Sequence, residues 1–321
     1  MPPPAIARRR SPSPPSPPAI ARRRHLHPLP SLRAATYRRL PTSQPHNAGF
    51  HLGGSMWRRK LKLDCMFMDK TPIPESLRKY ESFLESQRRL TTALQLTAHP
   101  VAPDEVCSAV IENPDGSRFG GAALVSQTYP WPSDYFNEPM FHLAQLNLSK
   151  LPAREGYPTS GLLQFFVADD GLMGLGETDD GSGFFGSVVR YIPDHEIPSM
   201  VLAYHHPQNC APISNGYFTV TGRLYHQLPH SGDEQFSDLY DPEKQLFAGG
   251  WPFFIQDDPR PQPSPTPDEN LELLLQIDDY ADTKSPVTIR WGDAGVAHFF
   301  ISPAALRNRD FRNVFYTWSC F

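Results

Sequence analysis

The sequence predicts an internally duplicated α+β fold, in which two mainly antiparallel β-sheet halves accompany an N-terminal amphipathic helix and a short C-terminal helix between strands. Three observations lead to this prediction. Several segments alternate apolar and polar residues with the two-residue period of a half-buried strand. Three blocks of sequence recur in the same order in the second half of the chain. A single change in composition separates a basic head from an acidic body.

The C-terminal segment has the clearest strand pattern. Every second residue between positions 271 and 277 is Leu or Ile, so we expect a strand with one buried face. Residues 287–291 alternate in the same way and end at the Gly-Asp-Ala-Gly turn of residues 292–295, which predicts a hairpin with a strand at 296–301. Residues 314–320 are rich in aromatic and β-branched side chains and predict a last strand.

Two helices are expected in the body of the chain. Ser302 and Pro303 supply an N-cap hydroxyl and a first-turn proline, so a short helix should follow them. Near the start of the body, the segment Pro-Ile-Pro-Glu at residues 72–75 opens a helix whose apolar residues recur near the 3.6-residue period. These apolar residues are Leu77, Tyr80, Phe83, Leu84 and Leu94. We expect this helix to pack against its own sheet.

An internal repeat organises the body. The three matched pairs of blocks are residues 119–121 with 247–249, 143–147 with 274–278, and 161–167 with 295–301. Their offsets are 128, 131 and 134 residues, so the spacing is nearly constant. We therefore expect two β-rich halves, about 115–170 and 245–321, joined by a variable segment.

The first 60 residues differ sharply from the rest. They contain 12 Lys or Arg and no Asp or Glu, so the remainder holds 30 − 12 = 18 basic and all 34 acidic residues. The sequence PPAIARRR occurs twice in this head, and so much proline with few large apolar residues predicts disorder. We place the boundary between a disordered segment, residues 1–66, and a folded domain, residues 67–321.

Three interpretations of the basic head stay open. A gene start placed too far upstream would produce such low-complexity text, with Met56, Met66 or Met68 as the initiator, and we favour this inert head. The alternatives are a basic arm for nucleic acid or membrane and an Arg-rich transit peptide. Prolines block the amphipathic helix that a transit peptide needs.

Several separated blocks of the body occur in one order: FGGAALVSQTYPWP, PMFHLAQLNLSKLP, GLLQFF, LFAGGWPFFIQDDPR, LLLQIDD and WGDAGVAHFFISPAALRNRDF. In sequence and order these blocks resemble the YwqG-like family, mostly bacterial proteins of unknown function, from about residue 68 to the end. The layout is also remotely similar to the programmed cell death protein 2 family, whose members act as dedicated chaperones of a ribosomal protein. That second resemblance implies client binding.

Polar residues on the matched strands are the candidate binding residues. Gln145 and Asn147 share one strand face, and Gln276 and Asp278 share the equivalent face of the repeat. A glutamine among leucines needs hydrogen-bond partners, since an unsatisfied buried amide costs about 1–3 kcal/mol. Either these amides bond to backbone and fix the register between the halves, or they line a groove between the halves. The candidates for such a groove are Gln145, Asn147, Gln276, Asp278, Trp291 and Asp293.

Catalytic and metal sites have weaker support in the sequence. His195-Glu196, His205-His206, Asp169-Asp170 and Asp179-Asp180 could supply ligands or an acid–base pair, but neighbouring side chains on an extended chain point to opposite faces. Signatures of serine, phosphate and zinc chemistry are missing. The four cysteines, Cys65, Cys107, Cys210 and Cys320, form no Cys-x-x-Cys pair, which is typical of a reducing cytoplasm and argues against zinc. We expect no metal and no cofactor.

Two functions remain for the body, whose net charge is 18 − 34 = −16. The first is a cytoplasmic protein-interaction module that binds a basic protein client, because an acidic surface attracts positive charge. The second is an enzyme of unknown class that uses carboxylates and histidines in a cleft between the halves. No apolar run reaches the roughly 18 residues of a membrane-spanning helix, so a membrane protein is not expected.

Overall fold

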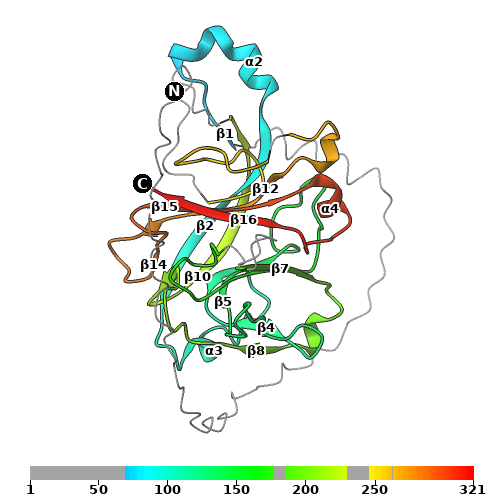
Figure 1. The fold of residues 1–321 in the computed structure, drawn as a ribbon. Coiled ribbons are helices and arrows are strands. Elements are labelled where there is room, and N and C mark those ends of the chain that lie inside the picture. Colours follow the sequence, from blue (N-terminus) through cyan, green and yellow to red (C-terminus); the bar gives the residue numbers. More distant parts are fainter. Residues whose placement is uncertain (1–68, 177–185, 230–245, 262) are drawn as a thin grey trace, which may run out of the picture. The chain divides into compact units, whose positions relative to one another are not determined.

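The computed structural model describes residues 69–176, 186–229, 246–261 and 263–321. The predicted disordered head, residues 1–66, lies outside these ranges, as does the Asp179-Asp180 pair. The described chain is mainly antiparallel β-structure with a few short helices, which agrees with the α+β class (Figure 1). Within these ranges no helix is long and apolar enough to cross a membrane.

One large sheet contains most of the strands, and every neighbouring pair along its main path is antiparallel. From one edge to the other the strands are β16 (Phe315–Cys320), β15 (Gly295–Ile301), β12 (Glu272–Asp278), β11 (Phe247–Ala248), β2 (Arg89–Pro100), β10 (Gly216–Gln227), β3 (Arg118–Gly120), β5 (Phe141–Asn147), β6 (Leu162–Val167) and β7 (Ser187–Ile192). A short strand, β1 (Asp69–Lys70), adds to β10 in parallel.

Smaller elements surround this sheet. A three-stranded sheet has the order β13 (Tyr280–Ala281), β14 (Thr288–Ile289), β9 (Ile213–Ser214), and a two-stranded sheet pairs β4 (Ala123–Val125) with β8 (Val201–Ala203). The helical segments are η2 (Glu75–Tyr80), α2 (Glu81–Ser86), α3 (Val106–Ala109), η3 (Ile197–Ser199), η5 (Pro267–Glu269) and α4 (Pro303–Arg307). The Ser302 hydroxyl accepts a hydrogen bond from the Ala305 N–H, so the predicted N-cap and short C-terminal helix are confirmed.

Strands β2 and β10 form the centre of the large sheet. Each is 12 residues long, and they pair along their whole length, from Gly216 opposite Pro100 to Gln227 opposite Arg89. The middle of this ribbon lies near the pair of Gln95 with Thr221. β11 pairs with β2 and β3 pairs with β10, so the strands on each side of the ribbon join it through a short strand.

The two outer parts of the sheet have the same pairing pattern. On one side Gln145 of β5 lies opposite Gln164 of β6, and the register shifts by one residue between His142 and Ala144. On the other side the pairing of β12 with β15 has the same features. Gln276 lies opposite His298, and the register shifts between Leu273 and Leu275.

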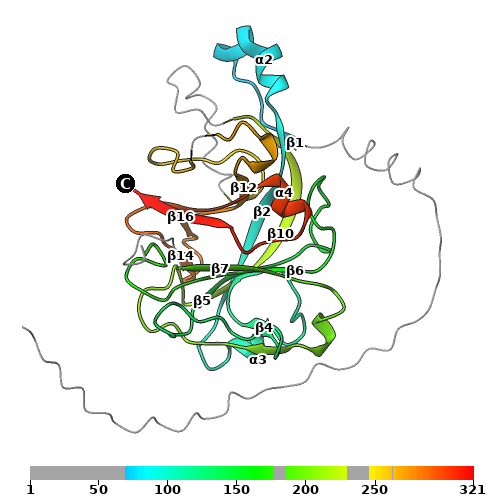
Figure 2. The same ribbon diagram turned by 45° about the vertical axis from the view of Figure 1, so that its right-hand side comes forward.

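A shared core joins the two outer parts. Phe165 of β6 and Phe299 of β15 pack edge to face, with ring centroids 5.0 Å apart, inside one cluster of buried residues drawn from both sides. The Tyr316 hydroxyl of β16 donates to the Met173 carbonyl at 2.7 Å, beyond the end of β6. In both views β16 lies just above β7 (Figures 1 and 2). The two ends of the sheet therefore pack on a common interior.

Two predictions about local structure are wrong. The strand β14 pairs with β13 and β9, and β15 pairs with β12 and β16, so the predicted hairpin between residues 287–291 and 296–301 does not form. The predicted extent of the N-terminal amphipathic helix is also wrong, because the helical segments η2 and α2 end at Ser86 and Leu94 lies on β2. Leu84 is buried as expected, whereas the Phe83 side chain is 53% exposed. The Thr-rich sequence after residue 88 favours a strand.

Candidate functional site

The six candidate side chains lie in three places. Gln145 and Asn147 are at the end of β5, Gln276 and Asp278 are at the end of β12, and Trp291 and Asp293 are in the connection before β15. The end of β12 lies beside the connection before β15, because the carboxylate of Asp279 accepts a hydrogen bond from the Trp291 N–H at 2.6 Å. We describe their contacts first and then an open groove that none of them lines.

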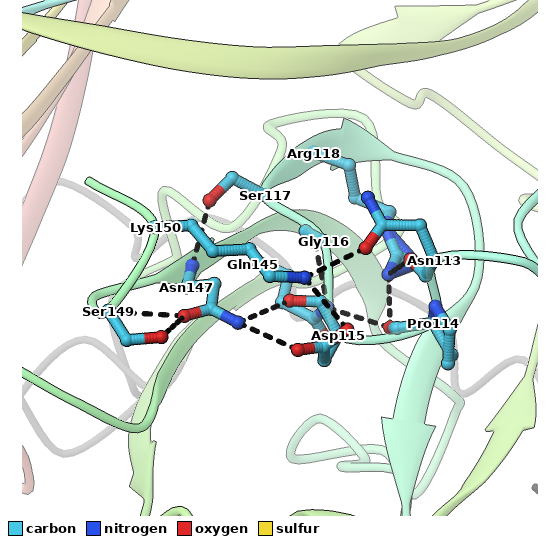
Figure 3. Close-up of polar contacts among 10 residues, drawn as sticks. All are labelled: Asn113, Pro114, Asp115, Gly116, Ser117, Arg118, Gln145, Asn147, Ser149 and Lys150. Carbon is cyan, nitrogen blue, oxygen red and sulfur yellow. Dashed lines mark hydrogen bonds and ion pairs between the residues drawn. The ribbon is translucent and has the colours of Figure 1, made fainter. Parts of the chain in front are cut away.

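Gln145 is fully buried and holds a loop (Figure 3). Its Nε2 donates to the carbonyls of Pro114 and Gly116, at 3.1 and 3.0 Å. Its Oε1 accepts from Nε2 of Gln164, the residue opposite, at 2.8 Å. All hydrogen-bonding groups of this amide therefore have partners, and the partners fix the loop against the sheet.

Asn147 and its neighbours hold the next part of the same loop (Figure 3). The Asn147 amide donates to the carbonyl and to a carboxylate oxygen of Asp115, and its oxygen accepts from Ser149. Lys150 completes the network by pairing with Asp115 at 3.0 Å. The loop of residues 113–117 is thus bonded along most of its length to β5 and to the turn that follows it.

Gln276 acts on a different loop in a similar way. Its Oε1 accepts from the Phe253 N–H at 2.8 Å, and His298, which lies opposite it, bonds to the Phe253 carbonyl through Nε2 at 2.7 Å. Burial lowers the pKa of His298 to about 4, so the ring is neutral and its N–H serves as the donor. Gln145 with Gln164, and Gln276 with His298, therefore form hydrogen bonds to backbone groups.

The Gln145→Leu substitution should destabilise the fold. The Leu side chain leaves the Pro114 and Gly116 carbonyls and the Gln164 amide without this partner, which should lower the free energy of unfolding by about 1–2 kcal/mol. Urea unfolding monitored by tryptophan fluorescence measures the change. Gln95→Leu is the matched control, because Gln95 is exposed at the centre of the ribbon. Equal stability of both variants would contradict a supporting role for Gln145.

Asp278, Trp291 and Asp293 have three different environments. Burial raises the pKa of Asp278 to about 7, while its carboxylate accepts a hydrogen bond from the Asp279 N–H at 2.7 Å. Trp291 is fully buried, 6.2 Å from the ring of Trp318, and Asp293 is exposed in the turn before β15. Of the three, Asp278 has the most unusual electrostatics.

The acidic and histidine pairs have structural contacts. The Asp169 carboxylate accepts from the backbone N–H groups of Gln208 and Asn209, and the Asp170 carboxylate accepts from those of Leu172 and Gly174. These carboxylates therefore order two loops.

The histidines of the joining segment do not converge on a site. His205 packs against Trp131, with ring centroids 4.6 Å apart, and burial lowers its pKa. His195 is exposed beside Glu196, at 3.7 Å. In the parts of the chain that the structure describes, no group of three or more His, Cys, Asp or Glu residues could hold a metal ion.

An open groove of about 810 Å³ lies at one end of the central ribbon. Its walls come from two segments, residues 100–106 and residues 204–216, and from Gly121 and Phe141. This volume is within the range of sites for small molecules or for a few residues of a peptide. Sequence reasoning missed the groove, because its walls come from loops and strand ends that carry no motif.

Named contacts position the groove walls. The Asp169 carboxylate holds the segment that carries Asn209, and the Val101 N–H donates to the Asn215 carbonyl at 3.4 Å. Gly121, at φ +72°, has backbone geometry that strongly favours glycine, and a Cβ there would lie 3.1 Å from Tyr217. The sequence makes the Asp169-Asp170 pair a metal candidate, but the anchoring contacts of Asp169 join it to residues 39 and 40 positions away, Gln208 and Asn209.

The groove is nearly free of charged groups. Among the described residues that line it, Glu105 is the only Asp, Glu, Lys or Arg, and its side chain is exposed. Cys210 is also exposed in the wall and is a free thiol. By contrast, burial raises the pKa of Cys107, which makes that thiol less reactive. The groove therefore offers one carboxylate, apolar surface, backbone groups and the polar side chains of Tyr204, His206, Asn209, Ser214 and Asn215.

Comparison with known proteins places the sequence in a family without an assigned activity. No curated protein matches the chain. The family described as a domain of unknown function (DUF1963) matches residues 117–320, which is well over half of the chain and extends from the residue before β3 to the end of β16. The chain therefore belongs to the DUF1963 family.

Proposed function

We propose that the protein is an interaction module that binds an extended, basic segment of a partner protein in the groove. The observation that carries this proposal is the composition of the groove. Its lining combines apolar surface with a single carboxylate, that of Glu105, and with the short strand β9. Apolar surface contributes affinity, and the carboxylate favours a positive residue in the bound segment.

Strand β9 supports binding of extended backbone. It is an edge strand of the three-stranded sheet. Just before it, the Pro212 carbonyl accepts a hydrogen bond from the Arg290 N–H at 2.8 Å. In an antiparallel ladder, hydrogen-bonded pairs alternate with pairs whose N–H and C=O groups point outward. Pro212 and Arg290 form a hydrogen-bonded pair, and Ile213 lies opposite Ile289 in the next pair. The N–H and C=O of Ile213 therefore point away from β14. A partner strand can use such an edge for main-chain hydrogen bonds.

The charge of the body supports a basic partner. Residues 61–321 carry a net charge of 18 − 34 = −16. A field of this sign attracts positively charged segments and accelerates their association at low salt. The remote resemblance of the sequence to the programmed cell death protein 2 family, whose members act as chaperones of a ribosomal protein, favours binding to a client.

We also propose that the two sides of the sheet are an internal duplication. The order of strands is symmetrical about the β2–β10 ribbon, and the register shifts of β5 with β6 and of β12 with β15 fall at matching positions. Arg118 lies opposite Gln145 as Phe247 lies opposite Gln276, which gives an offset of 129 residues. The same offset relates the glycine pairs 120–121 and 249–250, all four with positive φ.

Gln145 and Asn147 have a supporting role in this proposal. They hold the loop of residues 113–117, which follows the groove helix α3 in the chain, so they position groove-forming structure without lining the groove. Asp278 and Asp293 stay candidates for the partner surface, because both are acidic and neither is fully buried.

Charge reversal at the groove should weaken capture of the partner. Glu105→Lys in the full chain places a positive charge where we propose that a basic residue binds, so partners retained by the wild type should be recovered in several-fold lower amounts. Raising salt to about 0.5 M should have the same effect on the wild type, because it screens exposed charge pairs. Quantitative mass spectrometry of the retained proteins measures both.

Glu81→Lys is the control for total charge. Glu81 is exposed at the start of α2, so its reversal changes the net charge equally and leaves the groove intact. Equal losses in the two variants would show that only the net charge matters. Retention of all partners by Glu105→Lys would refute groove binding.

A further inference from the structure

The other half of the sheet contains a filled site that corresponds to the groove. Trp251 follows the Gly-Gly turn after β11, and its backbone N–H and C=O both bond to the Gln227 amide, at 2.7 and 3.0 Å. Its indole N–H donates to the Gln87 carbonyl at 2.9 Å. The Arg89 guanidinium lies 3.6 Å from the centre of the ring. A planar aromatic side chain is therefore fixed against the end of the β2–β10 ribbon.

The duplication proposed above maps this site onto the groove. Arg118 and Phe247 correspond at the offset of 129 residues, and they lie opposite Thr219 of β10 and Ala93 of β2. Thr219 and Ala93 are 126 residues apart. Positions in the β2–β10 ribbon therefore correspond at an offset of 126 residues. The residues that surround Trp251 therefore correspond as Gln87 with Ile213, Arg89 with Asn215, and Gln227 with Val101. All three counterparts line the groove.

The glycines provide a separate check on this correspondence. A Cβ on Gly250 would lie 2.7 Å from Cβ of Thr91, and a Cβ on Gly121 would lie 3.1 Å from Cβ of Tyr217. Thr91 and Tyr217 differ by the same 126 positions. The backbone after the Gly-Gly turn therefore meets the ribbon at matching places in both halves.

The groove half lacks the side chain that would fill the site. The position of Trp251 corresponds, at the offset of 129, to Ala122, which is fully buried and does not line the groove. The Ile213 carbonyl is the counterpart of the Gln87 carbonyl that accepts the indole N–H, and the ladder of β9 turns it away from β14. The other half thus contains the aromatic side chain that this half lacks.

We infer that the groove binds a planar aromatic side chain of the partner, with tryptophan as the best match, in the position that corresponds to the Trp251 indole. This inference rests on the proposed groove function and on the duplication. Phe141 and Val106 supply apolar surface for the ring, and the Ile213 carbonyl accepts its N–H. Glu105 then selects a basic residue beside the aromatic one. The partner segment combines an aromatic residue with positive charge.

Protection of Cys210 tests the inference directly on the full-length wild type. N-acetyl-L-tryptophanamide should slow alkylation of Cys210, which is exposed in the groove wall, and leave the half-buried Cys107 and Cys320 unaffected. N-acetyl-L-leucinamide should need about a three- to tenfold higher concentration for equal protection, since it lacks the aromatic contacts. Peptide-level mass spectrometry measures each thiol. Equal protection by both amides, or none by either, would overturn the inference.

Two variants locate the binding site. Ala211→Trp places an indole in the groove wall and should abolish protection, whereas Ala281→Trp, at an exposed position of β13, should not. Trp251→Ala empties the corresponding site, so equilibrium dialysis should show a second bound tryptophanamide per chain. Thermal melts identify any variant that fails to fold.

The outcomes separate this inference from the proposed function. If Trp251→Ala binds one amide and the wild type binds none, the aromatic anchor is wrong while capture of a basic partner is judged by the Glu105 variant alone. If Glu105→Lys keeps every partner yet the wild type binds tryptophanamide, the groove is a site for aromatic groups and the basic-segment proposal fails.

Discussion

The Arg118→Met substitution should lower the free energy of unfolding by about 3–5 kcal/mol. Arg118 is only 2% exposed, and its guanidinium donates to the carbonyls of Ala122 at 3.1 Å, Asn113 at 3.3 Å and Pro114. Methionine fills a similar volume but leaves all three carbonyls without this donor. The lost hydrogen bonds, each to a charged group, outweigh the relief of removing a buried charge.

The effect of Arg118 should not change with pH near neutrality. Burial lowers the pKa of Arg118 to about 10, so the side chain stays protonated below about pH 9. Urea unfolding at two neutral pH values measures the loss, and Arg78→Met, at an exposed arginine paired with Glu75, is the control. Arg118→Lys should recover part of the loss at most, because one ammonium lacks the fork that reaches several carbonyls. A loss below about 1 kcal/mol would show that water replaces the guanidinium.

Sequence patterns predicted the strands and the C-terminal helix where the structure depends on residues that are close together in the sequence. The alternation at residues 271–277 is the buried strand β12, and Ser302 caps α4 as its hydroxyl predicts. Leu94 shows the limit of such patterns. Leu94 fits the 3.6-residue period of the apolar residues before it, but pairing of β2 with β10 and β11 stabilises a strand there.

The pairing partner of a strand is a long-range property. Residues 287–291 and 296–301 are separated by a glycine-rich turn, which favours a hairpin locally. In the structure Ile289 pairs with Ile213, and Val296 pairs with Ser319. Trp291 and Val296 are both fully buried in the core, and a two-stranded hairpin could not bury them to this extent. Sequence spacing alone contains no information on that competition.

The groove could not be predicted from the sequence for the same reason. Glu105 and Cys210 carry no motif, and they meet in one groove only after β2 and β10 have paired. The buried glutamines were recognisable, since a polar residue repeated among leucines needs partners. Which partners they have depends on loops 20 to 30 residues away, such as the Gly116 carbonyl for Gln145.

The Asp278→Asn substitution should stabilise the protein above neutral pH and have little effect near pH 4. Burial, and the nearby charge of Asp279, raise the pKa of Asp278 from 3.8 to about 7. The folded state therefore binds the proton more tightly than the unfolded state does. The contribution of Asp278 to stability should therefore be lost as pH rises from about 4 to about 7 and stay absent above it. Asparagine keeps the acceptor for the Asp279 N–H and removes the buried charge.

The size of this change in stability follows from the pKa shift of Asp278 and from the partial exposure of its carboxylate. Three pKa units correspond to about 4 kcal/mol, and solvent at the half-buried carboxylate reduces this to about 2–3 kcal/mol at pH 8. Urea midpoints of both proteins at pH 4, 6 and 8 measure the difference. Asp293→Asn, at an exposed position, should change stability by less than about 0.5 kcal/mol at every pH. A constant difference between wild type and Asp278→Asn would mean that the pKa of Asp278 is the same in the folded and unfolded states.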